Sequence, residues 1–178
     1  MLAMSHSFRY SICTLVTDMA EYGLMKDSFR EKGFSEDCEY LLVDNSNGNQ
    51  ADAYQAIRHF LNIAKGKYVV LVHQDVRCQD ERKVLENCLS VLDNKDASWA
   101  LCGNAGAKGY HQDVMHINTN GRIDLSDNLP CRVDSLDENL IIIDAEKRIS
   151  ISSDLSGFHF YGTDLCLVAD YLGYHAYV

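Results

Sequence analysis

The stretch Tyr68–Asp75, YVVLVHQD, is an apolar run of valine and leucine that ends abruptly in His-Gln-Asp. A run without polar alternation predicts a strand buried on both faces, as in the middle of a parallel sheet. Open α/β sheets bind ligands just beyond the carboxyl ends of such strands. We therefore expect Asp75 to lie where a carboxylate can meet a metal ion or a phosphate ester.

Around this strand, the first two-thirds of the chain alternate between strand and helix patterns. Further strands are predicted at 10–16, 39–43 and 98–102, and helices at 20–32, at 51–65 and after an N-cap at Asp80. The helix at 51–65 has an apolar stripe with helical spacing, and Gly66 is expected to close it. This order predicts right-handed crossovers and a parallel sheet.

The last third of the chain has a different pattern. Residues 103–137 are rich in Gly, Asn and Asp and contain the only proline, Pro130, with a short strand predicted at 113–117. The run LIII at 140–143 predicts another buried strand, and 163–172 predicts a helix. Because no linker or repeat interrupts the chain, we expect a single domain over residues 1–178.

The composition limits the function classes. The 178 residues are 47% hydrophobic and 24% charged, with a net charge of −10, which argues against a nucleic-acid partner. The seven cysteines are scattered without a C-x-x-C pair, which favours a reducing, cytoplasmic compartment. No apolar run is long enough for a transmembrane segment, and the first residues do not resemble a signal peptide.

Two polar segments follow predicted strands and are candidate ligand sites. Asp44-Asn45-Ser46 ends the second strand, where Asp44 can accept hydrogen bonds from a ribose and Ser46 can reach a phosphate. The alternative is a turn, because Asn-Gly follows at once. His73-Gln74-Asp75 resembles a site for Mg²⁺ or Mn²⁺, which often take one or two carboxylates plus phosphates and water. Its alternative is an Asp75 that only caps the next turn.

Five segments, in this order and spacing, resemble family-2-like glycosyltransferases of the GT-A fold. They are YSICTLVTD, LLVDNSNG, GKYVVLVHQDV, RVDSLDENLIII and GFHFYGTDLCLVADYLGYHAYV. The resemblance covers nearly the whole chain and is most specific at VHQDV, which is similar to the D-x-D-like metal-binding element, and at FHFYGTDLCL. It implies a three-layer α/β/α sandwich around a mostly parallel sheet.

The resemblance also implies an activity. Such enzymes move a sugar from a nucleotide-sugar, often a UDP-sugar, to a hydroxyl of a glycan, lipid-linked or protein acceptor, usually with inversion and with Mn²⁺ or Mg²⁺. It places Asp75 on the metal and Asp137 and Glu138 in the donor or acceptor pocket. The residues that would hold the nucleotide are Thr14, Val16, Asp44, Ser46 and Gln74.

The chain departs from the family where the general base is expected. Gly162 stands where the relatives usually have an acid, so Asp164 is the candidate base, unless it only serves the helix dipole. His159 is a weaker alternative. The chain also ends before the histidine that relatives use at the metal, so it is expected to lack the usual C-terminal extension. The candidates to replace that histidine are His73, His111, His116 and His175.

Two other interpretations stay open at this point. A non-catalytic nucleotide-sugar-binding or assembly module would fit the missing acid at Gly162. A nucleotidyltransferase fits less well, because no Gly-rich loop with Arg and Lys follows Val16. A homo-oligomer and a peripheral association with the inner face of the membrane are both compatible with the sequence.

Overall fold

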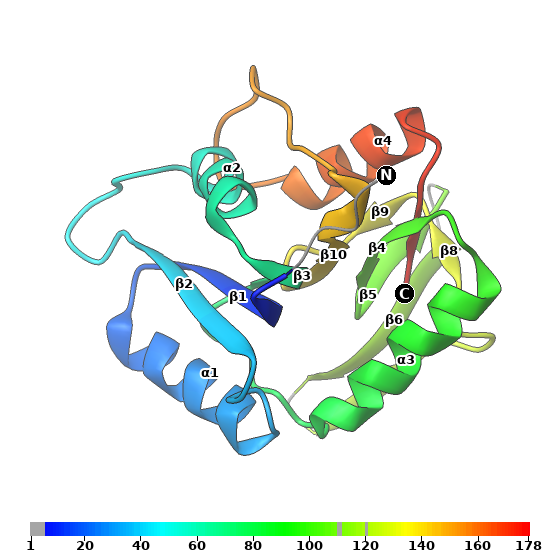
Figure 1. Ribbon diagram of the computed structural model, residues 1–178, viewed down its shortest axis with the longest axis horizontal. Helices are drawn as coiled ribbons and strands as arrows, with labels where there is room; N and C mark the ends of the chain where they lie inside the picture. Colours follow the sequence, from blue (N-terminus) through cyan, green and yellow to red (C-terminus); the bar gives the residue numbers. More distant parts are fainter. Residues whose placement is uncertain (1–5, 110–111, 120) are drawn as a thin grey trace.

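A computed structural model describes residues 6–109, 112–119 and 121–178 of the chain (Figure 1). In this part, a seven-stranded sheet lies between two helical layers, which confirms the predicted three-layer α/β/α sandwich. The spatial order is β2-β1-β3-β10-β4-β11-β8. The strands are Phe8–Val16 (β1), Cys38–Asp44 (β2), Gly66–Val72 (β3), Trp99–Gly103 (β4), Arg132–Val133 (β8), Leu140–Asp144 (β10) and His175–Tyr177 (β11).

The sheet is mostly parallel, as predicted. β1 pairs in parallel with β2 and β3, and β4 pairs in parallel with β11. β10 lies between β3 and β4 and runs antiparallel to both, and β8 runs antiparallel to β11. The start of β10 therefore lies at the same edge as the carboxyl ends of β1, β2 and β3.

The helices pack on the two faces of this sheet through separate apolar clusters. α1 (Met19–Glu31) and α3 (Arg82–Lys95) cover one face, and α2 (Ala53–Ile63) and α4 (Tyr161–Tyr171) cover the other (Figure 1). None of the helices in the described residues is long and apolar enough to cross a membrane. A single turn of 3-10 helix, η1 (Ala145–Lys147), follows β10.

β3 is the buried central strand that its sequence predicts. Val69 and Leu71 face α2 and α4, Tyr68, Val70 and Val72 face α1 and α3, and all five are at most 4% exposed. Burial of a Val or Leu side chain contributes about 1.5–3 kcal/mol. The burial of β3 therefore fixes the position of the sheet edge beyond which Asp75 lies.

Several predicted boundaries shift by one or two residues, and two of the shifts change the place of a named residue. α2 ends at Ile63 with Ala64 at its C-cap, and Gly66 is the first residue of β3 instead of the helix cap. Glycine is needed there because a Cβ would collide with the backbone of Ser11 on β1. α3 begins one residue later than predicted, with Glu81 instead of Asp80 at its N-cap and without a side-chain cap.

The Gly- and Asn-rich segment forms a second, four-stranded sheet in the order β7-β6-β5-β9. β6 confirms the short strand predicted at 113–117. The strands are Ala105–Lys108 (β5), Gln112–Thr119 (β6), Arg122–Leu125 (β7) and Ser135–Leu136 (β9).

Candidate functional site

A pocket of about 280 Å³ lies at the carboxyl ends of β1 and β3, against α2. We call it the β3-end pocket. Its residues come from the strand ends, from the first two turns of α2, and from the segment that leads into α4. They include Leu15, Thr17, Ala53, Ala56, Ile57, His73, Gln74, Asp75, Phe158 and Tyr161. The fold thus creates a pocket at the edge that the sequence predicts.

Asp75 lines this pocket with a free carboxylate. It is exposed, and its carboxylate makes no hydrogen bond or ion pair with any residue that the structure describes. Within the same described part, no group of three or more His, Cys, Asp or Glu side chains could hold a metal by itself. A single carboxylate nevertheless suits Mg²⁺ or Mn²⁺ when substrate phosphates and water complete the coordination.

Gln74 joins the ends of β1 and β3. Its Oε1 accepts hydrogen bonds from the backbone N–H groups of Thr17 (2.8 Å) and Asp18 (3.0 Å), and its Nε2 donates to Thr17 Oγ1 at 2.8 Å. Both ends of the amide are therefore engaged. Gln74 lines the pocket, but its polar atoms hold the chain that follows β1.

A hydrogen-bond chain links His73 to the start of α4. Tyr161 donates its hydroxyl proton to the carbonyl oxygen of Glu138 at 3.1 Å, and His73 Nε2 lies 2.8 Å from the same hydroxyl. Because a carbonyl only accepts, both contacts are hydrogen bonds only when His73 Nε2 donates. Burial raises the pKa of Tyr161, and Glu138 and Asp137 raise it further, so the phenol keeps its proton. A neutral His73 then has its lone pair on Nδ1.

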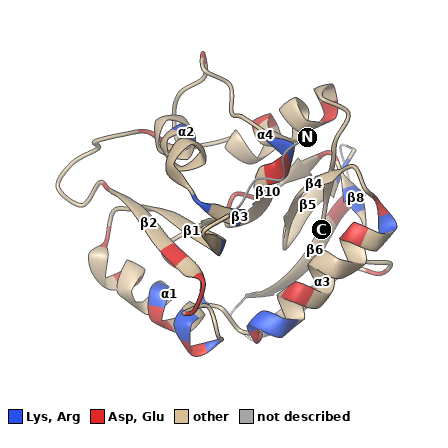
Figure 2. Cartoon of the chain, viewed as in Figure 1, with Lys and Arg blue, Asp and Glu red and all other residues tan. Residues whose placement is uncertain are grey.

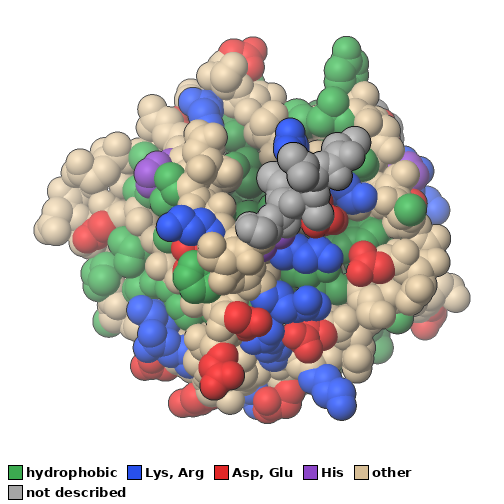
Figure 3. Space-filling model, viewed as in Figure 1, with side chains coloured by type: hydrophobic (Ala, Val, Ile, Leu, Met, Phe, Trp, Pro, Cys, Tyr) green, Lys and Arg blue, Asp and Glu red, His purple; other side chains and the backbone are tan. Residues whose placement is uncertain are grey.

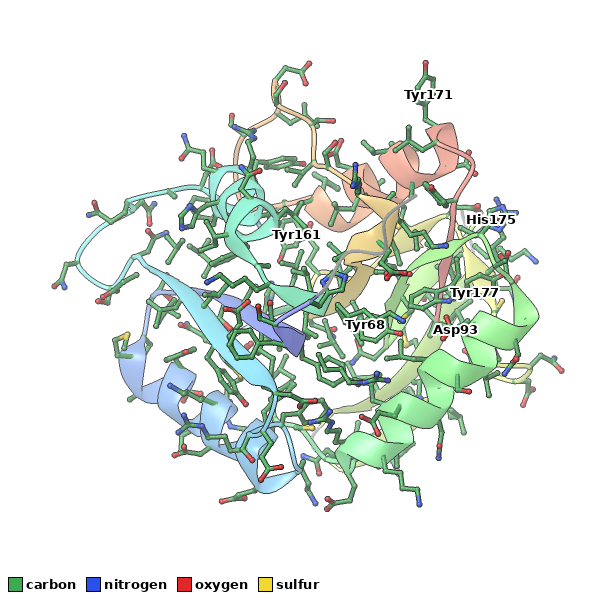
Figure 4. All side chains as sticks on the ribbon, in the orientation of Figure 1. Tyr68, Asp93, Tyr161, Tyr171, His175 and Tyr177 are labelled. Carbon is green, nitrogen blue, oxygen red and sulfur yellow. The ribbon has the colours of Figure 1, made fainter. Side chains whose placement is uncertain are left out.

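Tyr161 and Phe158 are pocket residues that the sequence did not single out. Figure 4 shows Tyr161 beside α2, and it is 6% exposed. The neighbouring Phe160 is 77% exposed and has a φ of 67°, a left-handed conformation that is uncommon for a bulky residue and that clusters at functional sites.

Two buried amide oxygens lie at the same edge of the sheet. Asn104 follows β4 and Asn139 precedes β10, and these strands pair at Ile141 and Gly103. The Oδ1 atoms of both asparagines are buried without a hydrogen-bond partner among the described residues. The backbone of Asn139 also accepts a hydrogen bond from His73 N at 3.0 Å. Both oxygens are buried, and neither asparagine lines the β3-end pocket.

Asp44 and Ser46 lie at the same edge but do not line the β3-end pocket. Asp44 Oδ1 accepts a hydrogen bond from Ser46 N at 2.8 Å, and hydrogen bonding from Ser46 lowers the pKa of Asp44. The segment forms the turn that was the alternative, with Gly48 N donating to Asn45 O at 3.2 Å, but α2 and not a paired strand follows it, so it is not a hairpin. Asn45, which is 4% exposed, accepts from the backbone of Gln50 and directs the chain into α2.

The side chains of Thr14 and Val16 do not reach the pocket. They are 1% and 0% exposed, and Val16 packs in the core under α1 and α3. Side chains alternate along a strand, so Leu15 and Thr17 face the pocket instead. Thr14 and Val16 therefore offer no side chain to this pocket, and their expected place beside a nucleotide stays a prediction.

Asp164 binds the loop that precedes α4. It is 7% exposed, and its two carboxylate oxygens accept hydrogen bonds from Ser152 N (2.8 Å) and Ser152 Oγ (2.6 Å). Both oxygens are thus engaged with Ser152 in the loop before α4, and the role of candidate general base stays a prediction. His159 is exposed and next to Phe158, but it does not line the pocket.

Gly162 lies too close to β9 for any side chain at this position. A Cβ at this position would meet the carbonyl oxygen of Leu136 on β9 far inside van der Waals contact. Asp137 and Glu138 come directly after Leu136, the last residue of β9. Gly162 N donates a hydrogen bond to Glu138 Oε1 at 3.5 Å. The predicted donor or acceptor acids are thus brought near the start of α4, although neither lines the pocket.

Of the histidines considered as metal ligands, only His73 lines the β3-end pocket among the described residues. His116 lies in β6 of the second sheet. His175 lies at the opposite edge, where its Nδ1 is 2.6 Å from Asp96 Oδ2. His111 lies outside the described residues.

Solved structures with a similar fold include glycosyltransferases. The mannosyltransferase PcManGT from Pyrobaculum calidifontis, in complex with GDP-Man and Mn²⁺, matches with a TM-score of 0.61 and 12% identity over 94% of this chain and 53% of its own. S. aureus TarS 1-349 matches with a TM-score of 0.61 and 13% identity over 96% of this chain and 58% of its own. A197 from STIV matches with a TM-score of 0.54 and 13% identity, covering 96% and 81%. This chain therefore spans little more than half the length of the two transferases.

The strand order and these matches define the class: the chain has a GT-A-type glycosyltransferase fold. No family model matches the sequence. The chain is 36% identical, over 179 residues, to the protein named ATP synthase subunits region ORF 6 from Fuscovulum blasticum, with 94% of this chain and 71% of that protein covered. It belongs to the family of that ORF 6 protein.

Proposed function

We propose that the chain is a glycosyltransferase that binds a nucleotide-sugar donor, preferably a UDP-sugar, and a divalent metal at the β3-end pocket. The free carboxylate of Asp75 at the carboxyl end of the central strand is the observation that supports this most. The mannosyltransferase of similar fold was solved with GDP-Man and Mn²⁺, which agrees with such a site. The reaction would serve polysaccharide or glycoconjugate synthesis in the cytoplasm or at the inner membrane face.

Residues of the β3-end pocket could bind the metal and keep it in position for this reaction. Bound on Asp75, Mn²⁺ or Mg²⁺ would offset the negative charge on the leaving nucleoside diphosphate. Gln74 keeps the ends of β1 and β3 together, so the carboxylate keeps its position relative to Thr17.

An inverting transfer also needs a group that accepts the proton of the attacking hydroxyl. Asp164 is occupied by Ser152, so we assign this role to an imidazole. His73 is the better candidate because it lines the pocket and keeps Nδ1 as an acceptor. The exposed His159 is the alternative.

Calorimetric titration with UDP and GDP, with and without Mn²⁺, tests the donor site. The Asp75→Asn substitution should weaken metal-dependent binding at least about tenfold, which equals about 1.4 kcal/mol. The matched control is Asp80→Asn, which removes an exposed carboxylate five residues further along the same segment and should leave the affinity unchanged. The proposal fails if neither nucleotide binds in a metal-dependent way.

A second candidate is a nucleotide-sugar-binding or assembly module without transferase activity. Two observations favour it: Gly162 leaves no room for an acid, and Asp164 is engaged. Binding and activity assays on the same purified protein distinguish the two functions. A protein that binds nucleotide and metal but neither transfers nor hydrolyses any donor of a broad panel is the module.

A further inference from the structure

A second and larger hollow, of about 500 Å³, lies at the edge of the sheet opposite the β3-end pocket. We call it the basic hollow. It opens where β3 begins and β10 ends, between the second half of α2 and the segment that follows η1. Its lining includes Ser7, Leu61, Gly66, Val69, Ile143 and Ile149. Its volume falls within the range of small-molecule sites.

Positive charge is concentrated at this hollow. Arg58, Lys65 and Arg148 line it together with His6, whereas no acidic side chain of the described residues does. Figure 2 shows Lys and Arg positions where α2 leads into β3. On the face seen in Figure 3, Lys and Arg side chains and acidic side chains lie interspersed around the middle. In a chain with a net charge of −10, such a lining favours an anion.

Two nitrogen atoms at the hollow make no hydrogen bond with the described residues. They are Arg58 Nε and His6 Nε2, and both are buried. The other end of the Arg58 guanidinium is held, because Nη2 donates to the carbonyl oxygen of Ser152 at 3.2 Å. Glu146 Oε1 lies 3.9 Å from His6 Nε2, which is too long for a hydrogen bond. A buried polar group without a partner costs about 1–3 kcal/mol, and a bound oxyanion would remove that cost.

The interior of the hollow is aliphatic. Val69 of β3, Ile143 of β10, and Ile149 and Ile151 of the following segment are at most 5% exposed and contribute to the lining. The site therefore offers charged donors together with an apolar surface. An organic anion fits this combination better than a bare inorganic ion does.

We propose that the basic hollow binds the phosphate group of an organic phosphate, whose carbon skeleton packs on the aliphatic residues. The phosphate oxygens accept hydrogen bonds from Arg58 and His6, and Lys65 adds charge at the mouth. The source of this group is either a soluble phosphate ester or a phospholipid headgroup. The site is separate from the β3-end pocket, since the two share the helix α2 but no lining residue.

Glycerol 3-phosphate and phosphatidic acid present the same group from these two sources. Binding of glycerol 3-phosphate is followed by the amide NMR signals of Gly66, Ile149 and Ile151, in EDTA so that metal-dependent binding at Asp75 does not contribute. Binding of the lipid is followed by co-sedimentation with phosphatidylcholine vesicles that contain or lack phosphatidic acid. Binding in either assay is expected.

Lys65→Gln and Arg58→Gln should each weaken that binding about tenfold, because each removes one charged contact. Lys65 is exposed, so its variant should fold even if Arg58→Gln loses stability with the Ser152 contact. Lys83→Gln, at an exposed position of α3, is the control for one lost charge. The proposal is overturned if both assays show no binding, or if Lys83→Gln weakens binding as much as Lys65→Gln.

Discussion

At the scale of single residues, Gly162 and Asp164 decide how the first turn of α4 packs. Gly162 lets the first turn of α4 touch the backbone of β9, and Asp164 ties that turn to Ser152. Both residues therefore serve the packing of α4. A carboxylate at position 162 would need β9 and α4 to move apart.

We predict that Gly162→Ala is strongly destabilising. The new Cβ would overlap the carbonyl oxygen of Leu136, and overpacking of this kind costs about 1–3 kcal/mol. The matched control is Gly23→Ala in α1, where a Cβ meets nothing within 4 Å. That change should stabilise the protein by up to about 1 kcal/mol, because alanine has a higher helix propensity than glycine. Urea unfolding measures both, and equal effects would contradict the close contact at Gly162.

At the scale of elements, the first residues of α2 bind the loop that forms one side of the β3-end pocket. Asp52 Oδ1 accepts from Gln55 N at 2.8 Å, and Gln55 Oε1 accepts from Asp52 N at 3.0 Å, which forms a capping box. Asp52 Oδ2 also accepts from Gly157 N at 3.2 Å, and Ala53 N donates to Gly157 O at 3.0 Å. One carboxylate thus caps the helix and holds the loop that presents Phe158.

We predict that Asp52→Ala lowers the free energy of unfolding by about 1–2 kcal/mol, because it removes a helix cap and the contact with Gly157. Glu81→Ala is the control, since Glu81 is at the N-cap of α3 without a side-chain cap. Its ion pair with Lys32 is exposed and contributes little. Chemical denaturation measures both variants. An equal loss in the two would show that the capping box does not stabilise α2.

At the scale of the whole molecule, Asp96 connects β11 to the end of α3. Asp96 Oδ2 lies 2.6 Å from His175 Nδ1 and accepts from the Tyr177 hydroxyl at 2.9 Å. Figure 4 shows His175 and Tyr177 on the side of the molecule that carries α3. Burial alone would raise the pKa of Asp96, but hydrogen bonds from His175, the backbone of Ser98 and Tyr177 lower it overall.

This lowered pKa predicts a loss of stability in acid. A carboxylate whose pKa is lower in the folded state stabilises the fold above its unfolded pKa, about 3.9, and that stabilisation disappears as the pH falls through the folded pKa. Asp96→Asn should cost about 1 kcal/mol at neutral pH and flatten the dependence of unfolding free energy on pH below about 4.

Unfolding by urea at a series of pH values measures this dependence. Asp154→Asn, in an exposed loop, controls for the loss of one negative charge, so the difference between the two variants is the relevant quantity. Identical pH dependence in both variants would show that Asp96 does not tie β11 to the fold.

The sequence alone was sufficient to predict the central strand β3, the alternation of strands and helices, and the edge at which Asp75 lies. These features follow from short-range patterns: an apolar run makes a buried strand, and parallel strands align their carboxyl ends. The apolar stripe of α2 likewise predicted which face packs on the sheet.

Only the tertiary structure decided which polar side chains are free. Gln74 is engaged by Thr17, 57 positions away, and Asp164 by Ser152 across a loop. Thr14 faces the core because of its place in the strand alternation, and Gly162 is required by the backbone of β9. Such contacts join residues that are distant in sequence, so no local pattern reports them. Asp75 at the end of YVVLVHQD therefore followed from the sequence, whereas Tyr161, the basic hollow and the engagement of Asp164 followed from the fold.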